Sequence, residues 1–177
     1  MKQTKNEFIL IIIISLIILS SIIFVLSSNI VTGNVLVIQN NTTGIKTEFY
    51  LPDSKFSLGY IHSVMKTPAE EFFYVDEHDI ILEKTIYESF GVGLPFLADS
   101  KDFELKDDKF ILYTKRTFKQ INMIISPIPK HYLQIGDTQY QLMDILKESD
   151  CSITIYVQEK KILKSLFNFS SNIIFII

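Results

Sequence analysis

One apolar run near the start of the chain constrains its architecture more than any other feature. From Phe8 to Leu26 the chain is apolar except for Ser15, Ser20 and Ser21, over 19 residues. A helix rises about 1.5 Å per residue, so the run would span roughly 28 Å, close to the ~30 Å hydrocarbon core of a membrane. Its Ile, Leu, Phe and Val side chains each favour insertion by about 0.3–0.6 kcal/mol, which outweighs the serines. The run therefore predicts a transmembrane helix that contacts membrane lipid.

Charged residues around this run predict its orientation. Lys2 and Lys5 precede it, and no Lys or Arg follows until Lys46. Since positive charge stays on the cytoplasmic side, we expect a single-pass anchor in the cell membrane with the rest of the chain outside the cytoplasm. A cleaved signal peptide is the alternative, but its apolar region usually covers about 7–15 residues and ends at a small-x-small site. Residues 25–27 match such a site weakly, and both interpretations export the remainder of the chain.

The remainder is long enough for one folded domain. With roughly 150 residues per domain as a guide, we expect residues 1–29 to form the anchor, 30–160 the extracytoplasmic domain and 161–177 an apolar tail. The formal net charge is -3 and no basic patch occurs, which argues against nucleic acid as a partner. Cys151 is the single cysteine, so no internal disulfide can form, and its apolar neighbours predict a buried side chain.

Short stretches rich in Ile, Phe, Tyr, Thr and Val recur along the domain, and these residue types suit a pleated sheet. The predicted strands are 35–39, 46–51, 56–64, 71–75, 80–87, 110–113, 121–126, 132–135, 140–142 and 152–158. Only residues 143–148 look helical. This pattern predicts an all-β fold: an antiparallel β-sandwich or partly open barrel of about 9–10 short strands, preceded by one N-terminal transmembrane helix.

Polar segments between these stretches predict hairpin connections. They are residues 40–44, 76–79, 106–109 and 136–138. Each contains Asn, Asp or Gly, which tolerate a positive φ or bond their own backbone. Antiparallel pairing of the flanking strands is therefore expected at these positions.

The densest group of potentially functional residues surrounds His62. It lies near the end of a predicted strand, and Pro68 forces Thr67 out of the helical region, so the chain turns here. Side chains alternate faces along a strand, which places Tyr60 and His62 on one face and Ser63 on the other.

A carboxylate is expected to approach this histidine. If the chain returns antiparallel after Pro68, Glu70 or Glu71 comes near His62. A His–carboxylate pair can close a hydrogen-bond network, bind a polar ligand or partner, or hold a metal. The sequence leaves these alternatives open.

Two further segments carry candidate residues. Gly91 and Gly93 are followed by Leu94 and Pro95, a spacing that permits unusual backbone angles but matches neither a phosphate-binding loop nor a nucleophile elbow. We interpret this segment as a tight loop, or as a loop whose amides face a ligand. His131 begins a predicted strand, where it is expected at the surface or in a polar network. No common metal-ligand spacing occurs, so the sequence assigns no catalytic residue, no metal and no cofactor.

Taken together, these motifs resemble one family. The stretch YIHSVMKTPAEE that begins at Tyr60, the stretch SFGVGLP that begins at Ser89, and the late His131 resemble the bacterial and archaeal domain-of-unknown-function family numbered 1850. The resemblance covers residues 35–157, with Val92 where the family usually has Ala. Its motif positions correspond here to His62, Ser63, Thr67, Pro68, Glu71, Gly91, Gly93, Leu94 and Pro95.

The resemblance implies a small exported domain with no assigned activity. Members of this family are often encoded beside tripartite TRAP-type transporters of the TAXI class, whose binding proteins collect small organic acids or amino acids. A permease or solute-binding protein of that class is therefore the partner that the resemblance implies.

Two functional hypotheses follow. The first is a non-enzymatic accessory of a TRAP-type transporter, which contacts the partner or the solute. Its tentative binding residues are His62, Ser63, Thr67, Glu70, Glu71, Gly91, Gly93 and His131. The second is a metal- or small-ligand-binding, enzyme-like domain in which His62, Glu70 or Glu71, and His131 converge on one pocket.

Overall fold

The computed structural model describes residues 2–28, 30–62, 65–88, 102–148 and 150–163. The chain divides into two compact units, one that contains the N-terminal helix and one that spans Gly33–Lys160, and each is described by itself.

The N-terminal helix α1 covers Lys2–Ser28. Its segment Glu7–Val25 has 19 residues and a mean hydropathy of 3.3, and none of it is buried. Ser15, Ser20 and Ser21 donate hydrogen bonds to helix carbonyls three residues earlier, at 2.8, 3.0 and 2.8 Å, which satisfies their hydroxyls without water. By length and composition α1 can cross a membrane as an anchor, and a signal sequence would have the same character.

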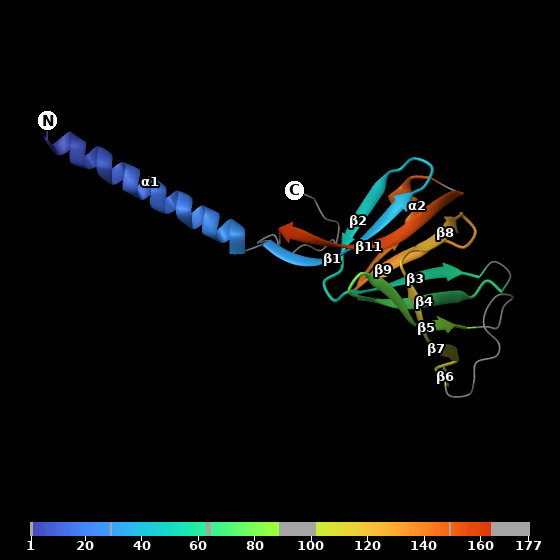
Figure 1. The fold of residues 1–177 in the computed structure, drawn as a ribbon. Helices are drawn as coiled ribbons and strands as arrows, with labels where there is room; N and C mark the ends of the chain where they lie inside the picture. Colours follow the sequence, from blue (N-terminus) through green and yellow to red (C-terminus); the bar gives the residue numbers. More distant parts are fainter. Residues whose placement is uncertain (1, 29, 63–64, 89–101, 149, 164–177) are drawn as a thin grey trace. The chain divides into compact units, whose positions relative to one another are not determined.

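The second unit is built from strands in two sheets, with one short helix (Figure 1). In chain order the elements are β1 (Ile30–Asn40), β2 (Lys46–Tyr50), β3 (Lys55–Ile61), β4 (Pro68–Asp76), β5 (Asp79–Tyr87), β6 (Phe103–Lys106), β7 (Lys109–Phe118), β8 (Ile121–Ile125), β9 (Tyr132–Ile135), β10 (Thr138–Gln141), α2 (Leu142–Leu146) and β11 (Cys151–Leu163). The first sheet has the order β2-β1-β11-β8, and the second has the order β10-β9-β3-β4-β5-β7-β6. The two sheets are mostly antiparallel, which confirms the predicted all-β class.

The predicted hairpins form where turn residues were expected. They join β1 to β2, β4 to β5, β6 to β7, and β9 to β10. Gly44, Glu77, Asp107, Asp108 and Gly136 in these turns have positive φ. At the first turn the Asn40 side-chain oxygen also accepts hydrogen bonds from the backbone amides of Thr42 and Thr43, at 2.8 and 3.1 Å. The local turn chemistry therefore sets much of the strand order.

Three details differ from the sequence prediction. β6 was missed because most of its side chains are exposed at the sheet edge, so it lacks an apolar pattern. Leu142 belongs to α2 and not to the preceding strand, and the helix ends at Leu146, where Lys147 turns into the left-handed region. β3 ends at Ile61, and the last two residues of the strand predicted for 56–64 lie outside the described residues.

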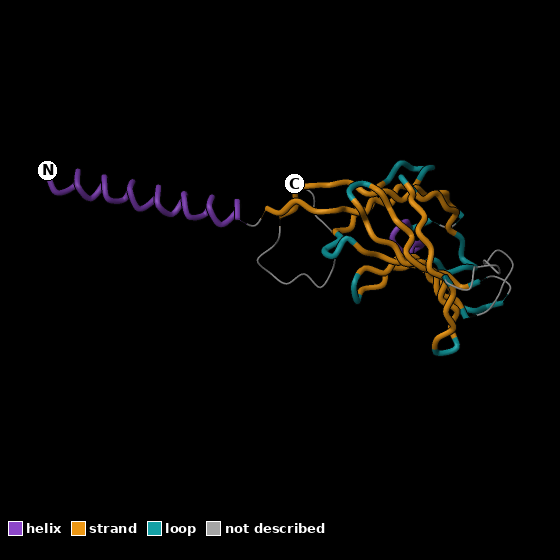
Figure 2. The backbone as a smooth tube through the Cα atoms, turned by 60° about the horizontal axis from the view of Figure 1, so that its bottom comes forward, coloured by secondary structure: helices purple, strands orange, loops and turns teal. Residues whose placement is uncertain are grey.

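The two sheets pack over one apolar core. Leu36, Phe49 and Ile153 come from the first sheet, and Phe56 and Phe73 from the second, with ring centroids of the two phenylalanines 5.0 Å apart. Cys151 is buried in this core, as predicted, and burial raises the pKa of its thiol. The helix α2 lies among the strands and buries Leu142 and Leu146 (Figure 2).

A smaller apolar cluster lies on the same face of the second sheet, toward β6. Ala69, Tyr87 and Leu112 are buried there, and Phe103 and Phe110 pack against them.

Candidate functional site

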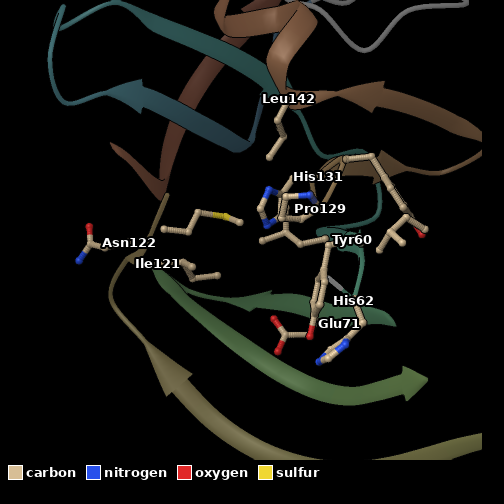
Figure 3. A pocket seen from close by; sticks show the side chains of 13 residues that line it. Tyr60, His62, Glu71, Ile121, Asn122, Pro129, His131 and Leu142 are labelled. Carbon is tan, nitrogen blue, oxygen red and sulfur yellow. The ribbon is translucent and has the colours of Figure 1, made fainter. Parts of the chain in front are cut away.

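A pocket of about 500 Å³ opens on the inner face of the second sheet (Figure 3). β3 and its following turn contribute residues 58–62, and β4 contributes Glu71. The facing wall comes from residues 121–123 of β8, from Leu142 at the start of α2, and from Pro129, His131 and Tyr132. Segments distant in the sequence therefore form one cavity.

The pairing of β3 with β4 decides which carboxylate faces the pocket. Leu58 opposes Glu71, and Tyr60 opposes Ala69. Directly opposed residues of an antiparallel pair point to the same face, and Leu58 lies in the main core, so Glu71 and Tyr60 face inward as well. Of the two acidic residues predicted near His62, Glu71 is the one on the pocket wall.

Glu70 lies on the opposite face of the sheet and does not line this pocket. It opposes Gly59 and accepts a 2.5 Å hydrogen bond from the Ser57 hydroxyl. The Tyr132 phenol is also hydrogen-bonded to Glu70. Burial raises the pKa of Tyr132 to about 12, with smaller contributions from the charge of Glu70 and from this hydrogen bond. Glu70 thus belongs to a structural network on the outer face of the sheet.

Gly59 makes room for this network. It is paired with Tyr132 on β9, and a Cβ at Gly59 would lie 2.0 Å from the tyrosine ring. Sequence analysis missed Ser57, Gly59 and Tyr132. Strand alternation would place Ser57 and Gly59 on one face, but the approach of Tyr132 depends on a pairing between strands distant in the chain.

The turn after β3 holds His62. The His62 amide donates to the Thr67 carbonyl at 2.8 Å, and the Lys66 amide donates to the His62 carbonyl at 2.9 Å, with Lys66 at a φ of 58°. The Met65 amide donates to His62 Nδ1 at 3.2 Å, so the neutral ring carries its proton on Nε2. His62 is buried, and Thr67 is half-buried in the same turn.

His131 reaches the pocket from the connection between β8 and β9. The His131 carbonyl accepts from the Leu142 amide at 3.0 Å, while the Ile61 amide donates to the Pro129 carbonyl at 2.6 Å. The His131 ring centroid lies 6.0 Å from that of Tyr60. Its Nδ1 is buried and finds no hydrogen-bond partner among the described residues. Burial lowers the pKa of His131, which favours the neutral ring at pH 7.

The Glu71 carboxylate lies beside the end of the Tyr60 side chain, with His62 close by (Figure 3). Burial raises the pKa of Glu71, and the charge of Arg116 partly opposes this. Burial and then the Glu71 charge raise the pKa of Tyr60. The Glu71 carboxyl group in the pocket is therefore harder to ionise than a glutamate exposed to solvent.

The remaining predicted residues divide into two groups. Ser63, Gly91 and Gly93 lie outside the described residues, together with Leu94 and Pro95. His62, Glu71 and His131 line one pocket, but within the described ranges no three His, Cys, Asp or Glu side chains form a group that could hold one metal ion. The arrangement offers hydrogen-bonding groups and an apolar wall to a small molecule.

These features define a class: an antiparallel two-sheet β domain with a pocket between its sheets, in a chain that begins with an apolar helix. Residues 56–142 match the family model described as "Domain of unknown function (DUF1850)", and the chain belongs to this family through that segment. The match is narrower than the 35–157 expected from the motifs, and it contains each pocket residue named above. Comparison with curated proteins and with solved structures gave no match.

Proposed function

We propose that this protein is a membrane-anchored, extracytoplasmic binding domain that acts as a non-enzymatic accessory of a TRAP-type transporter of the TAXI class. In this proposal α1 anchors the chain in the membrane, and the pocket binds the transported solute or a related small molecule. The permease or the solute-binding protein is the partner.

The pocket is the observation that carries the binding role. Its volume of about 500 Å³ falls within the ~300–1,000 Å³ typical of small-molecule sites. Such sites combine an apolar lining with a few convergent polar groups, and here the polar groups come from Tyr60, His62, Glu71 and His131. Three of these four positions were selected from the sequence motifs alone.

The membrane location rests on α1 and on charge. The apolar segment Glu7–Val25 is long enough to span a bilayer, and Lys2 and Lys5 lie before it. Positive charge at the N-terminal end favours a cytoplasmic N-terminus, which would put the β domain outside. The transporter link rests on the family, whose members are often encoded beside TAXI-class transporters.

The test is cross-linking in the native membrane, followed by affinity purification of the full-length protein and mass spectrometry of what is recovered. A TRAP-type permease or solute-binding protein should be enriched over a control purification from cells with an untagged copy. Recovery of this protein alone, at cross-linking levels that capture known membrane complexes from the same cells, would contradict the accessory role.

A further inference from the structure

The geometry points to a ligand class: we propose that the pocket binds a small molecule with a protonated primary amine on an apolar body, the ammonium group at Glu71. This inference rests on the proposed binding function and adds the chemistry of the ligand.

The carboxylate of Glu71 is the anchor of this argument. It lies on the pocket wall, and no hydrogen bond or ion pair to it forms within the described part of the chain. By contrast, neighbouring Glu70 is hydrogen-bonded to two hydroxyl groups on the other face. A half-buried carboxylate without a partner gains most from a ligand that brings its own donors and positive charge.

The described pocket lining supplies no competing cation. None of its residues is Lys or Arg. Arg116 is the basic residue that acts on Glu71, but its side chain is exposed, with the guanidinium carbon 5.4 Å from the centroid of the Phe118 ring. The positive charge that would balance Glu71 is therefore left for the ligand.

Two aromatic rings complete the polar end. Tyr60 and His131 lie with their centroids 6.0 Å apart, and the Tyr60 hydroxyl is beside Glu71 (Figure 3). A cation within about 6 Å of a tyrosine ring face is attracted by the ring quadrupole. The His131 ring belongs to the pocket lining, and its Nδ1 is buried without a hydrogen-bond partner among the described residues. An ammonium group at Glu71 would have three donors and would lie beside the Tyr60 side chain (Figure 3).

The other end of the pocket is apolar. Ile121 and Met123 of β8, Pro129 and Leu142 line it. These side chains suit a hydrocarbon or aromatic body attached to the amine. An anionic ligand would instead meet Glu71 across a pocket whose His131 is neutral at pH 7, because burial lowers the pKa of that histidine.

Three ligands that share a phenylethyl body and differ in the polar end group test the proposal. Phenethylamine, 2-phenylethanol and 3-phenylpropanoate are titrated at pH 7.5 into the full-length protein in detergent micelles, with isothermal titration calorimetry as the readout. The amine should bind at least about tenfold more tightly than either analogue. Glu71→Gln should weaken the amine by about tenfold, which corresponds to about 1.4 kcal/mol, since it removes a charge-assisted hydrogen bond.

A matched carboxylate controls for general charge. Glu83→Gln alters an exposed glutamate of β5 outside the pocket and should leave the amine affinity unchanged. Far-UV circular dichroism follows the unfolding of both variants and tests whether Glu71→Gln retains the fold.

Any of three results would overturn the ligand class: tighter binding of 3-phenylpropanoate or 2-phenylethanol, amine binding that Glu71→Gln leaves intact, or failure of all three ligands to bind. The accessory role is judged separately, because partner recovery from the membrane does not depend on these probes.

Discussion

Glu70 and Glu71 are adjacent in the chain and face opposite sides of the same sheet. Glu70 opposes Gly59 and is hydrogen-bonded to Ser57 and Tyr132, whereas Glu71 opposes Leu58 and lines the pocket. Glu70 takes part in a structural hydrogen-bond network, and Glu71 faces the pocket. Several predictions depend on this difference.

Replacement of the two glutamates should have opposite consequences for stability. Glu70→Gln loses the charge that accepts hydrogen bonds from Ser57 and Tyr132, and should cost about 1–3 kcal/mol of unfolding free energy. Glu71→Gln removes a half-buried charge that makes no hydrogen bond or ion pair with a described residue, and it should be neutral or stabilising at pH 7. Chemical denaturation of the full-length variants in one detergent compares them, and an equal loss in both would contradict the assignment of faces.

The effect of Glu71→Gln should depend on pH. Burial raises the pKa of Glu71 above its ordinary value of about 4.3, so the folded state holds this proton more tightly than the unfolded state. As the pH rises above about 4.3 through the folded pKa, the wild type should therefore lose stability relative to Glu71→Gln. Thermal unfolding from pH 4 to pH 8 measures this, with Glu83→Gln as the control. If the wild type instead lost stability relative to Glu71→Gln as the pH fell, the prediction would be wrong.

Gly59→Ala should disturb the outer-face network. The added Cβ would lie 2.0 Å from the Tyr132 ring, whose hydroxyl is held by Glu70, so the ring must move and we expect a loss of about 1–3 kcal/mol. The cost should shrink in a Tyr132→Ala background, because the obstructing ring is then gone. A double-mutant cycle of unfolding free energies tests this coupling, and additive effects would argue against the contact.

The proposed orientation predicts which sites are accessible from outside. A cysteine introduced as Asp108→Cys, in the exposed β6–β7 turn, should react in intact cells with a maleimide that does not cross membranes. Lys2→Cys should react only after the cells are opened. The buried Cys151 sets the background, measured on the unaltered chain. Labelling of Lys2→Cys but not of Asp108→Cys in intact cells would reverse the proposed topology.

Local sequence signals were sufficient for much of the fold. Asn40, the Asp107–Asp108 pair and Gly136 determine turns by their own backbone preferences, so the hairpins around them were predictable. The strand β6 was not predictable in this way, because an exposed edge strand needs little alternation of apolar and polar residues.

The candidate site was only partly predictable for a different reason. Alternation fixes that Glu70 and Glu71 face opposite sides, but it does not say which side holds the pocket. That choice depends on the register of β3 with β4, where a shift of one residue would exchange the two carboxylates. The turn from His62 to Thr67, with Lys66 at positive φ, fixes this register. Likewise His131 reaches Tyr60 only through the packing of distant segments.

The central claim is that this pocket serves a transporter complex, and one comparison tests it most directly. The double variant His62→Ala with Glu71→Ala and the control Glu83→Ala are expressed at equal membrane levels, cross-linked and purified. We predict that the control recovers the TRAP-type partner as well as the wild type does, while the double variant recovers at most about a tenth as much, a tenfold loss that corresponds to about 1.4 kcal/mol. Equal recovery with both variants would contradict the claim that the pocket around Glu71 is the functional site.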